Sequence, residues 1–213
     1  MATSAFDLSS HIAKTSDKSD LKGRTISQPL GEYSYGLSTR WNVGIKVPTI
    51  YVDSKWYGNG VVGEVKYLAP HGDGEDGFYW GFELEAGYLS PFKESRSWVM
   101  EAVPILGYRV GRWHFIANPG LSLSSAGDDK GLSFEPNFKR AYQFDKRNAL
   151  GLEYYIDAGM LKETLPGNRR NEVACLAWDT KVGKNDVNFG IGRGTSSVSD
   201  RWMVKLNVEF EIN

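Results

Sequence analysis

The final segment of the chain, RWMVKLNVEFEIN at residues 201–213, alternates apolar and polar side chains with a period of two. Such alternation predicts a β-strand with one apolar face and one polar face. In a soluble sandwich the apolar face turns inward to a core, whereas in a membrane barrel it turns outward to lipid. The direction of this face therefore decides which class of fold the chain can adopt.

Comparable segments recur along the whole chain, and helical periodicity is nearly absent. Most are long enough for a strand that crosses a membrane, which needs about nine to eleven residues, whereas globular strands average about five or six. The first two segments alternate poorly. We predict twelve strands, near residues 3–13, 24–38, 41–53, 59–69, 78–91, 96–109, 113–124, 131–143, 149–160, 171–181, 186–195 and 200–212.

The links between these segments differ in length in a regular way. Short links at 38–40, 111–112, 145–148 and 183–185 alternate with longer links along the sequence. Only the link at 70–77 is long where a short one is expected. Short turns at one end and longer loops at the other are typical of outer-membrane barrels. We therefore expect a closed, antiparallel, up-and-down barrel of about twelve strands, with both termini at the short-turn end.

The composition of the polar rows favours a lumen over a solvent-facing surface. In FYWGFELEAGYL at 78–89, one row is apolar and the other mixes glutamate, glycine and tyrosine, and the segments at 41–51 and 149–160 behave similarly. Glycine makes room for long charged side chains in a crowded interior. The predicted lumen-lining residues are Lys46, Glu64, Lys66, Glu83, Glu85, Glu101, Arg109, Glu135, Lys139, Glu153, Asp157, Lys205 and Glu209.

Charge in this predicted lumen is unbalanced. With Asp179, Lys181 and Glu211 added, the inward set holds ten acids and six bases. Charges inside a barrel must be paired or hydrated, because an isolated buried charge is very costly. The rows are therefore compatible with two interiors: a salt-bridged plug of side chains, or a polar channel that weakly favours cations.

Aromatic side chains gather near strand ends on the apolar rows. Tryptophan and tyrosine are enriched at membrane interfaces because each combines an apolar ring with a polar tip. The predicted interface aromatics are Trp41, Tyr51, Trp80, Trp98, Tyr108, Trp113, Trp202 and Phe210. This placement favours the apolar face as the outside of the barrel.

Four prolines, at positions 48, 104, 119 and 136, fall inside predicted strands. Proline lacks the backbone donor that a strand ladder needs and is usually found at sheet edges or bulges. In a closed barrel these residues predict bulges along one side of the wall.

Length and composition limit the remaining possibilities. At 213 residues, we expect one domain over 1–213 in a mature form, since the start has no basic end followed by an apolar run. The net charge of −1 gives no reason to expect nucleic acid as a partner. The lone Cys175 excludes an internal disulfide and is expected to be a buried thiol.

Residues that could carry chemistry are sparse. His114 shares a predicted face with Asn118 and Ser122, but these positions are too spread along one strand to form a catalytic triad. No spacing typical of metal ligands occurs, and the glycine-rich GIGRG at 190–194 leads into a strand rather than the helix that a phosphate site requires. We therefore expect no catalytic residue, no metal and no cofactor.

Several segments resemble Gram-negative outer-membrane β-barrel proteins. VPILGYRVGRWHFIANPGLSL, FEPNFKRAYQF, ALGLEYYIDAG and VNFGIGRGTSSVSDRW are similar to a family of uncharacterised proteobacterial outer-membrane barrels described as transporters of unknown substrate. The resemblance covers about residues 33–213 and brings no catalytic motif. It implies a place in the bacterial outer membrane, contact with membrane lipid and lipopolysaccharide, and insertion by the outer-membrane assembly machinery. That machinery reads a terminal aromatic residue, and here the nearest to the end is Phe210.

These observations favour passive, porin-like transport of small polar solutes or ions. The main alternative is a structural or adhesion barrel with a plugged lumen. An outer-membrane hydrolase and a soluble ligand-binding barrel are weaker alternatives.

Overall fold

The computed structural model describes residues 4–18, 21–71, 75–90, 96–127, 130–163 and 165–212. Within them the chain is almost entirely β-structure. The strands are β1 (Ser4–Lys14), β2 (Thr25–Gly36), β3 (Trp41–Val52), β4 (Lys55–Gly58), β5 (Gly60–Leu68), β6 (Gly77–Leu89), β7 (Ser97–Val110), β8 (Trp113–Ser124), β9 (Gly131–Gln143), β10 (Asn148–Asp157), β11 (Asn171–Val182), β12 (Asn185–Gly194) and β13 (Trp202–Ile212).

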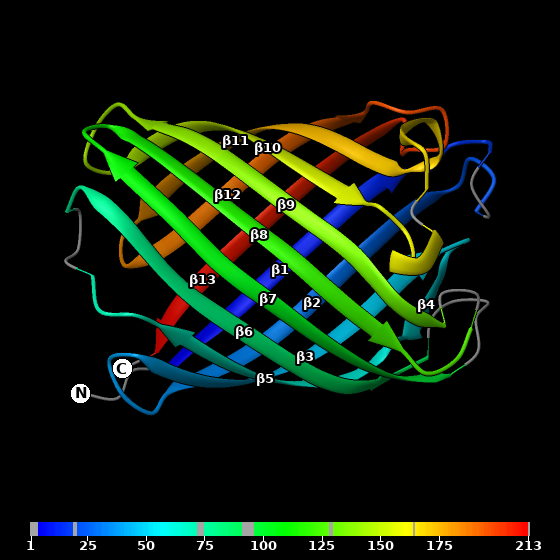
Figure 1. Ribbon diagram of the computed structural model, residues 1–213, viewed down its shortest axis with the longest axis horizontal. Coiled ribbons are helices and arrows are strands. Elements are labelled where there is room, and N and C mark those ends of the chain that lie inside the picture. The colour runs from blue at the N-terminus through cyan, green and yellow to red at the C-terminus, as the bar shows by residue number, and fades with distance from the viewer. Residues whose placement is uncertain are drawn as a thin grey trace.

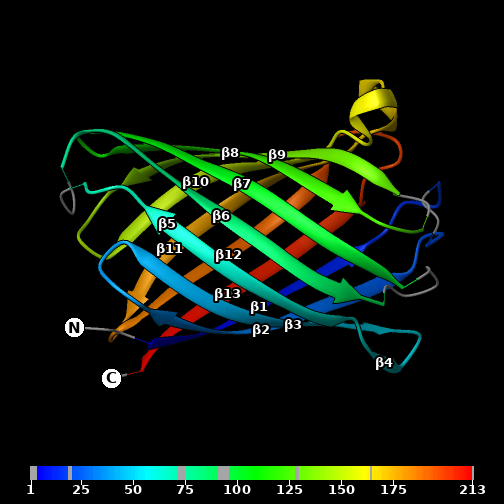
Figure 2. The same ribbon diagram turned by 60° about the horizontal axis from the view of Figure 1, so that its bottom comes forward.

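The strands form one closed antiparallel barrel (Figures 1 and 2). Strands that follow one another in sequence pair, except that β4 and β5 both pair with β3, and β1 pairs with β13, so no long strand in the described ranges is left at an open edge. Thirteen strands occupy twelve positions around the wall, because β4 and β5 both pair with β3. Closure satisfies the backbone hydrogen bonds of the wall, which a membrane environment requires. The predicted fold class is confirmed.

The two weakest predicted strands are fully formed. β1 pairs along its whole length with β13 on one side and β2 on the other, from Ser4 to Lys14. Its pairing on both sides explains why a poor alternation still forms a strand: tertiary context outweighs local propensity.

The loop predicted between 53 and 59 contains a strand instead. Thr49 pairs with Gly58, whereas Lys46 pairs with Val62, so three steps along β3 face four steps along β4 and β5. One extra residue in one strand is a β-bulge, and here it lies at 59–60. Gly60 has a φ of +126°, which other residues rarely adopt. β4 and β5 are therefore one strand interrupted by a bulge.

The predicted bulges are wrong for three of the four prolines, whereas Pro48 lies opposite the bulge at 59–60 and its carbonyl accepts from the N–H of Asn59. Pro104, Pro119 and Pro136 point outward, and the registers of β6–β7, β7–β8 and β8–β9 continue past them without an extra residue. Between β7 and β8 the pairing is interrupted from 103 to 105, opposite 118 to 120, and resumes in the same register. The amide of Asn118 donates to the carbonyl of Pro104 at 3.4 Å. A side chain thus replaces ladder bonds that the prolines remove.

The two ends of the barrel differ as expected. Both termini lie at the end with the turns at 37–40, 111–112, 144–147 and 183–184 (Figure 1). Most connections at the other end are longer, with two exceptions to the pattern: a tight turn at 53–54 lies at that other end, and the long link between β5 and β6 lies at the end with the termini. The connection after β10 holds two short 3₁₀ helices, η1 (Leu161–Glu163) and η2 (Gly167–Arg169), and β10 ends at Asp157, three residues before the predicted strand end. No helix in the described part of the chain is long and apolar enough to span a membrane.

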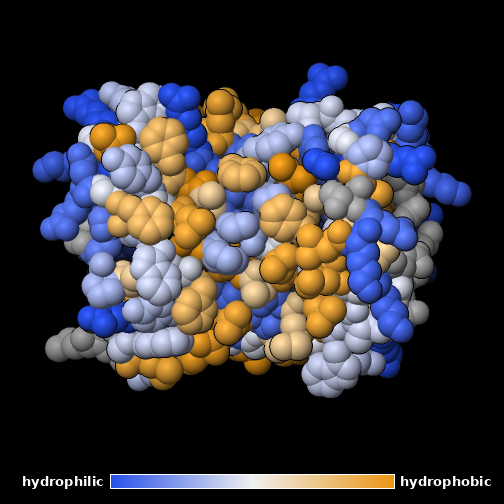
Figure 3. Space-filling model, in the orientation of Figure 1, coloured by the Kyte–Doolittle hydropathy of each residue, from blue (hydrophilic) through white to orange (hydrophobic). Residues whose placement is uncertain are grey.

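The outer surface is apolar and the inside is polar. Trp98, Leu152 and Leu84 are 66%, 62% and 49% exposed, and they lie on rows of similar residues. On the face drawn in Figure 3, apolar side chains gather across the middle of the barrel and polar ones at both ends. So large an exposed apolar area is incompatible with a soluble monomer but suits a lipid environment.

Within the described part of the chain, buried apolar residues form two small clusters. One contains Ala13, Val173, Cys175 and Met203, which all lie on inward rows. The other joins Ile26, Ile50 and Val52. Both lie towards the long-loop half of the barrel interior, and Cys175 is a free, buried thiol as predicted. Apart from these clusters, the interior is dominated by charged side chains and glycine.

Candidate functional site in the barrel lumen

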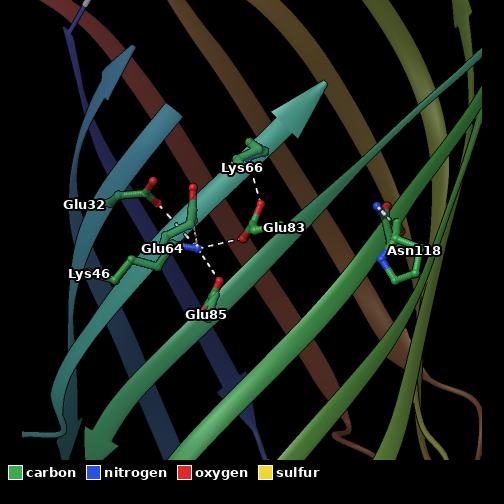
Figure 4. A network of polar contacts seen from close by, with 8 residues as sticks. Glu32, Lys46, Glu64, Lys66, Glu83, Glu85 and Asn118 are labelled. Carbon is green, nitrogen blue, oxygen red and sulfur yellow. Dashed lines mark hydrogen bonds and ion pairs between the residues drawn. The ribbon is translucent and has the colours of Figure 1, made fainter. Parts of the chain in front are cut away.

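One group of charges surrounds the ammonium of Lys46 (Figure 4). Its Nζ lies 2.9 Å from Glu83 Oε1, 2.5 Å from Glu85 Oε1 and 3.9 Å from Glu32 Oε2, and it also contacts Glu64. The other carboxylate oxygen of Glu83 lies 2.9 Å from Lys66 Nζ. We call this group, drawn from β2, β3, β5 and β6, the Lys46 cluster: Glu32, Lys46, Glu64, Lys66, Glu83 and Glu85.

The Lys46 cluster carries more negative than positive charge. Four carboxylates meet two ammonium groups, which leaves two negative charges in excess when all are ionised. Oxygen atoms of Glu64, Glu83 and Glu85 lie within 4.8 Å of one another, a spacing that a metal ion could bridge. Lys46 already contacts all three carboxylates, so its ammonium supplies the positive charge there.

A second group of charges lies on the other side of the barrel, on β9 to β13. Lys139 Nζ lies 3.1 Å from Glu153 and 2.7 Å from Asp179, and Lys205 pairs with the other oxygen of Glu153. Four further hydrogen bonds join these groups to Tyr155 and Asn188. We call it the Glu153 cluster: Lys139, Glu153, Tyr155, Asp179, Asn188 and Lys205.

Glycine makes room for the Glu153 cluster. A Cβ on Gly190, which lies opposite Lys205, would be 2.9 Å from the Cε of that lysine and 3.1 Å from the sulfur of Cys175. Both distances are tighter than ordinary contacts. Packing of the Lys205 side chain against the wall thus explains Gly190, the first glycine of GIGRG, whereas a Cβ on Gly192 would crowd Val173 and Cys175 instead.

Water has access to part of both clusters. The side chains of Glu64, Glu153 and Lys205 are nearly inaccessible, at 2%, 5% and 4% exposed. In contrast, the side chains of Lys66 and Asp179 remain 34% and 32% exposed although they point into a closed wall. Polar interior space therefore remains beside the paired charges.

Directly opposed carboxylates form a row across four neighbouring strands. Asp186 on β12 lies opposite Glu209 on β13, Glu209 lies opposite Asp7 on β1, and Asp7 lies opposite Glu32 on β2. Lysines lie opposite the two ends: Lys181 pairs with Asp186, and Lys46 with Glu32. We call Asp186, Glu209, Asp7 and Glu32 the first acidic row.

A second acidic row lies across β5, β6 and β7, where Glu64, Glu85 and Glu101 are directly opposite one another. Like charges directly opposite on neighbouring strands are destabilising. Seven carboxylates in two such rows, four and three, therefore cost stability unless cations or solvent screen them.

Three inward acids were missed from the sequence: Asp7, Glu32 and Asp186. In β2, Ile26 and Leu30 share the inward row with Glu32, so the row does not read as polar. Asp186 lies beside a tight turn, where a charged residue does not indicate which face of the strand it occupies. Only the register of β1 with β13 and β2 reveals that these acids face one another.

The other predicted lumen residues lie outside the two clusters. Arg109 lies opposite His114, and Glu135 opposite Gly120. Asp157 ends β10 at the long-loop rim and accepts a bond from the backbone N–H of Gly159 at 2.9 Å. Arg109 and Glu209 both line a cavity of about 420 Å³ at the short-turn mouth.

The cavity at the short-turn mouth mixes both signs of charge. Its basic lining comes from Arg109, Arg112, Lys139, Lys146, Arg147 and Lys181, and its acidic lining from Asp7, Asp179, Asp186 and Glu209. The cavity thus joins the first acidic row to the Glu153 cluster and opens at the end where the termini lie.

His114 is hydrogen-bonded to a tyrosine and forms no catalytic pair with Asn118 or Ser122, which share its face. Its Nε2 lies 2.6 Å from the hydroxyl of Tyr79, whose ring packs over Gly107 on the next strand. Asn118 bonds instead to the carbonyl of Pro104. His114, Asn118 and Ser122 therefore share a face without forming a hydrogen-bonded chain that could activate a hydroxyl.

The eight predicted interface aromatics are all exposed on the outer surface. They lie at two levels. Tyr51, Trp98 and Trp202 lie towards the long-loop end, and Trp41, Trp80, Tyr108, Trp113 and Phe210 towards the short-turn end.

Several of these aromatics pack, tilted or edge-on, against a partner on the next strand. Trp41 and Tyr67 have ring centroids 4.8 Å apart, and Trp113 and Tyr142 4.9 Å apart. Cross-strand aromatic pairs stabilise a sheet and fix its register. The partners were not predicted, because pairing across strands depends on the register.

No protein-family model and no curated protein matches this sequence. Solved structures with a similar fold include the COG4313 outer membrane channel from Pseudomonas putida F1, at 10% identity and a TM-score of 0.72, covering 100% of this chain and 96% of that one. KdgM porin matches at 10% identity and a TM-score of 0.61, covering 98% and 99%. A second KdgM structure, in complex with disordered oligogalacturonate, matches at 9% identity and 0.63, covering 98% and 99%. The chain has the fold of outer-membrane β-barrels.

Proposed function

We propose that this protein is a passive channel of the bacterial outer membrane that passes small cations and small polar solutes through a narrow lumen. The observation that carries the proposal is the pair of acidic rows. Lys46 and Lys181 pair with four of these carboxylates, but no ion pair within the described residues joins Asp7, Glu101 or Glu209. Opposed carboxylates without a paired cation are destabilising for the wall, and they attract cations along a lumen whose low-dielectric wall focuses their field.

The partial exposure of the charged clusters supports a hydrated passage. Lys66 and Asp179 keep about a third of their side-chain surface accessible inside the wall. The cavity of about 420 Å³ at the short-turn mouth gives this passage an entrance. The channel is narrow, because the side chains of the two clusters extend into the lumen from opposite walls.

The charge of the lumen also bears on the class of solute. KdgM porin was solved in complex with oligogalacturonate, a polyanion. The acidic rows here would repel such a chain electrostatically. We therefore propose cations and neutral solutes, and no acidic oligosaccharide, as the cargo of this protein.

The second candidate is a structural barrel whose lumen is closed by side chains. It is favoured by the near-complete burial of Glu64, Glu153 and Lys205, whose ion pairs stiffen the wall. A function as an outer-membrane hydrolase has less support, because His114 is hydrogen-bonded to Tyr79 and not to a residue that would complete a catalytic triad. Phospholipid and lipopolysaccharide on the outer face, and the assembly machinery during insertion, are the proposed partners.

Planar bilayer recording tests the proposal. The folded protein should give discrete conductance steps, and a salt gradient should give a reversal potential of the sign expected for cation preference. The preference should weaken at high salt, where screening shortens the range of the field. Replacing Glu83 and Glu101 together by glutamine should reduce it. Anion preference would contradict the assignment, and no conductance from folded protein would favour the structural barrel.

A further inference from the structure

One charged residue lies on the lipid-facing side of the wall where apolar residues surround it. Arg140 is exposed and lies between Phe138 and Tyr142 on the outward row of β9. Its guanidinium carbon lies 4.3 Å from the ring centroid of Trp113 and 5.8 Å from that of Phe115. No carboxylate in the described ranges lies within ion-pair distance of it.

The register gives the depth of Arg140. Trp113 pairs with Tyr142 beside the tight turn at 111–112, and Phe115 pairs with Arg140. The backbone of Arg140 thus lies one outward position deeper in the apolar band than the Trp113–Tyr142 pair. Its side chain returns to the level of Trp113. Long cationic side chains near a membrane interface extend in this way towards the polar boundary.

An apolar groove begins beside this guanidinium. It has a volume of about 620 Å³ on the outer surface across β6 to β11, and Arg140 is part of its lining. Ala117 and Ala174 are small, and they lie in one row with Phe138 and Tyr154. The small residues hollow the surface between larger ones, and Leu106 and Leu152 also line the groove.

We propose that Arg140 and this groove bind one phospholipid of the leaflet at the short-turn end, with the phosphate on the guanidinium and an acyl chain in the groove. The inference rests on the proposed membrane location but not on transport. A phosphate at that depth suits the planar fork of arginine, which can form two charge-assisted hydrogen bonds with its oxygens. The mostly apolar lining, which spans β6 to β11, suits hydrocarbon.

Native mass spectrometry of the full chain in detergent tests the site. The probes are phosphatidylglycerol and a diacylglycerol with the same acyl chains, added at equal concentrations. The wild type should retain one phosphatidylglycerol preferentially over the diacylglycerol. Arg140→Gln should weaken that retention about tenfold, as expected when charge-assisted bonds worth roughly 1.4 kcal/mol are lost. Ala117→Phe should weaken retention of both lipids by filling the groove.

Arg193→Gln is the matched control, because Arg193 is exposed on an outward row of β12 near the long-loop end. It should leave phosphatidylglycerol retention unchanged. Equal retention by the wild type and Arg140→Gln, or an equal loss in Arg193→Gln, would overturn the site. Heat-dependent mobility on a gel should confirm that each variant is folded. Conductance of Arg140→Gln should equal that of the wild type, so failure here leaves the transport proposal untouched.

Discussion

The ammonium of Lys46 and a carboxylate oxygen of Glu83 lie 2.9 Å apart on strands that are not neighbours. β5 separates β3 from β6 in the wall, and its Glu64 contacts the same ammonium. One lysine thus links three consecutive positions of the barrel on the lumen side. The backbone ladder joins only adjacent strands, so this contact adds a second level of cross-linking.

Replacing Lys46 by methionine should destabilise the barrel strongly. The change leaves Glu64, Glu83 and Glu85 close together without their shared cation. Removing one partner of a buried ion pair costs about 3–5 kcal/mol. Urea unfolding in lipid vesicles should show a loss near the lower figure, because water reaches part of the cluster. Lys66→Met is the control and should cost less, since the Lys66 side chain is 34% exposed and contacts one carboxylate, that of Glu83.

A positive charge at the centre of the outer face should impair folding. Leu84 lies in the middle of β6 and is 49% exposed. Leu84→Arg should cost about 2–4 kcal/mol in a bilayer folding assay, since arginine at the midplane faces hydrocarbon. Asn207→Ser, on the inward row of β13, should be tolerated. The opposite order of severity would show that the two faces are inverted.

Gly87 illustrates why an inward position is not always permissive. The sequence places Gly87 on the lumen row and predicts that Gly87→Ser is mild. In the structure a Cβ there would overlap the carbonyl of Val61 and the side chain of Val62. Asn207 is therefore the better lumen control.

Adding one methyl group at Gly107 should displace the ring of Tyr79. Tyr79 lies opposite Gly107 on the neighbouring strand, and a Cβ there would overlap the ring. Overpacking of this kind costs about 1–3 kcal/mol, and the hydrogen bond between Tyr79 and His114 would be lost. The unfolding midpoint of Gly107→Ala should fall. Gly63→Ala should behave as wild type, because the nearest atom to its Cβ would be 3.8 Å away.

The turn between β9 and β10 should weaken in acid. Asp145 accepts bonds from the backbone N–H groups of Arg147 and Asn148, at 2.7 and 2.8 Å. These bonds, chiefly that from Arg147, hold the pKa of the Asp145 carboxyl below its ordinary value. A carboxyl whose pKa is lowered in the folded state stabilises the protein at pH values above the ordinary pKa. That stabilisation is lost as the pH falls through the pKa of the folded state.

The destabilisation caused by Asp145→Ala should therefore be present at neutral pH and shrink as the pH falls below the usual range of aspartate. Denaturant midpoints of the two proteins at several pH values measure this difference. A difference that stays constant with pH would show that the carboxylate bonds do not contribute.

The sequence by itself determined most of the strands and their faces, with β4 and the inward acids Asp7, Glu32 and Asp186 as exceptions. Side chains of a strand alternate between two sides, so the neighbours Leu84 and Glu85 had to point in opposite directions. Length and apolar content then made the apolar side the outer one. Tight turns and long loops followed from local turn chemistry, which needs no distant contact.

The tertiary structure alone decided which side chains meet. Asp7 and Glu32 are far apart in a chain whose first strands alternate poorly, and only the register of a closed barrel places them opposite each other. The same holds for Arg140 over Trp113, which depends on how β8 aligns with β9. Register is set by the pairing of whole strands around the ring. Period-two alternation is local, so it fixes the face of a residue and leaves its partner across the strand undetermined.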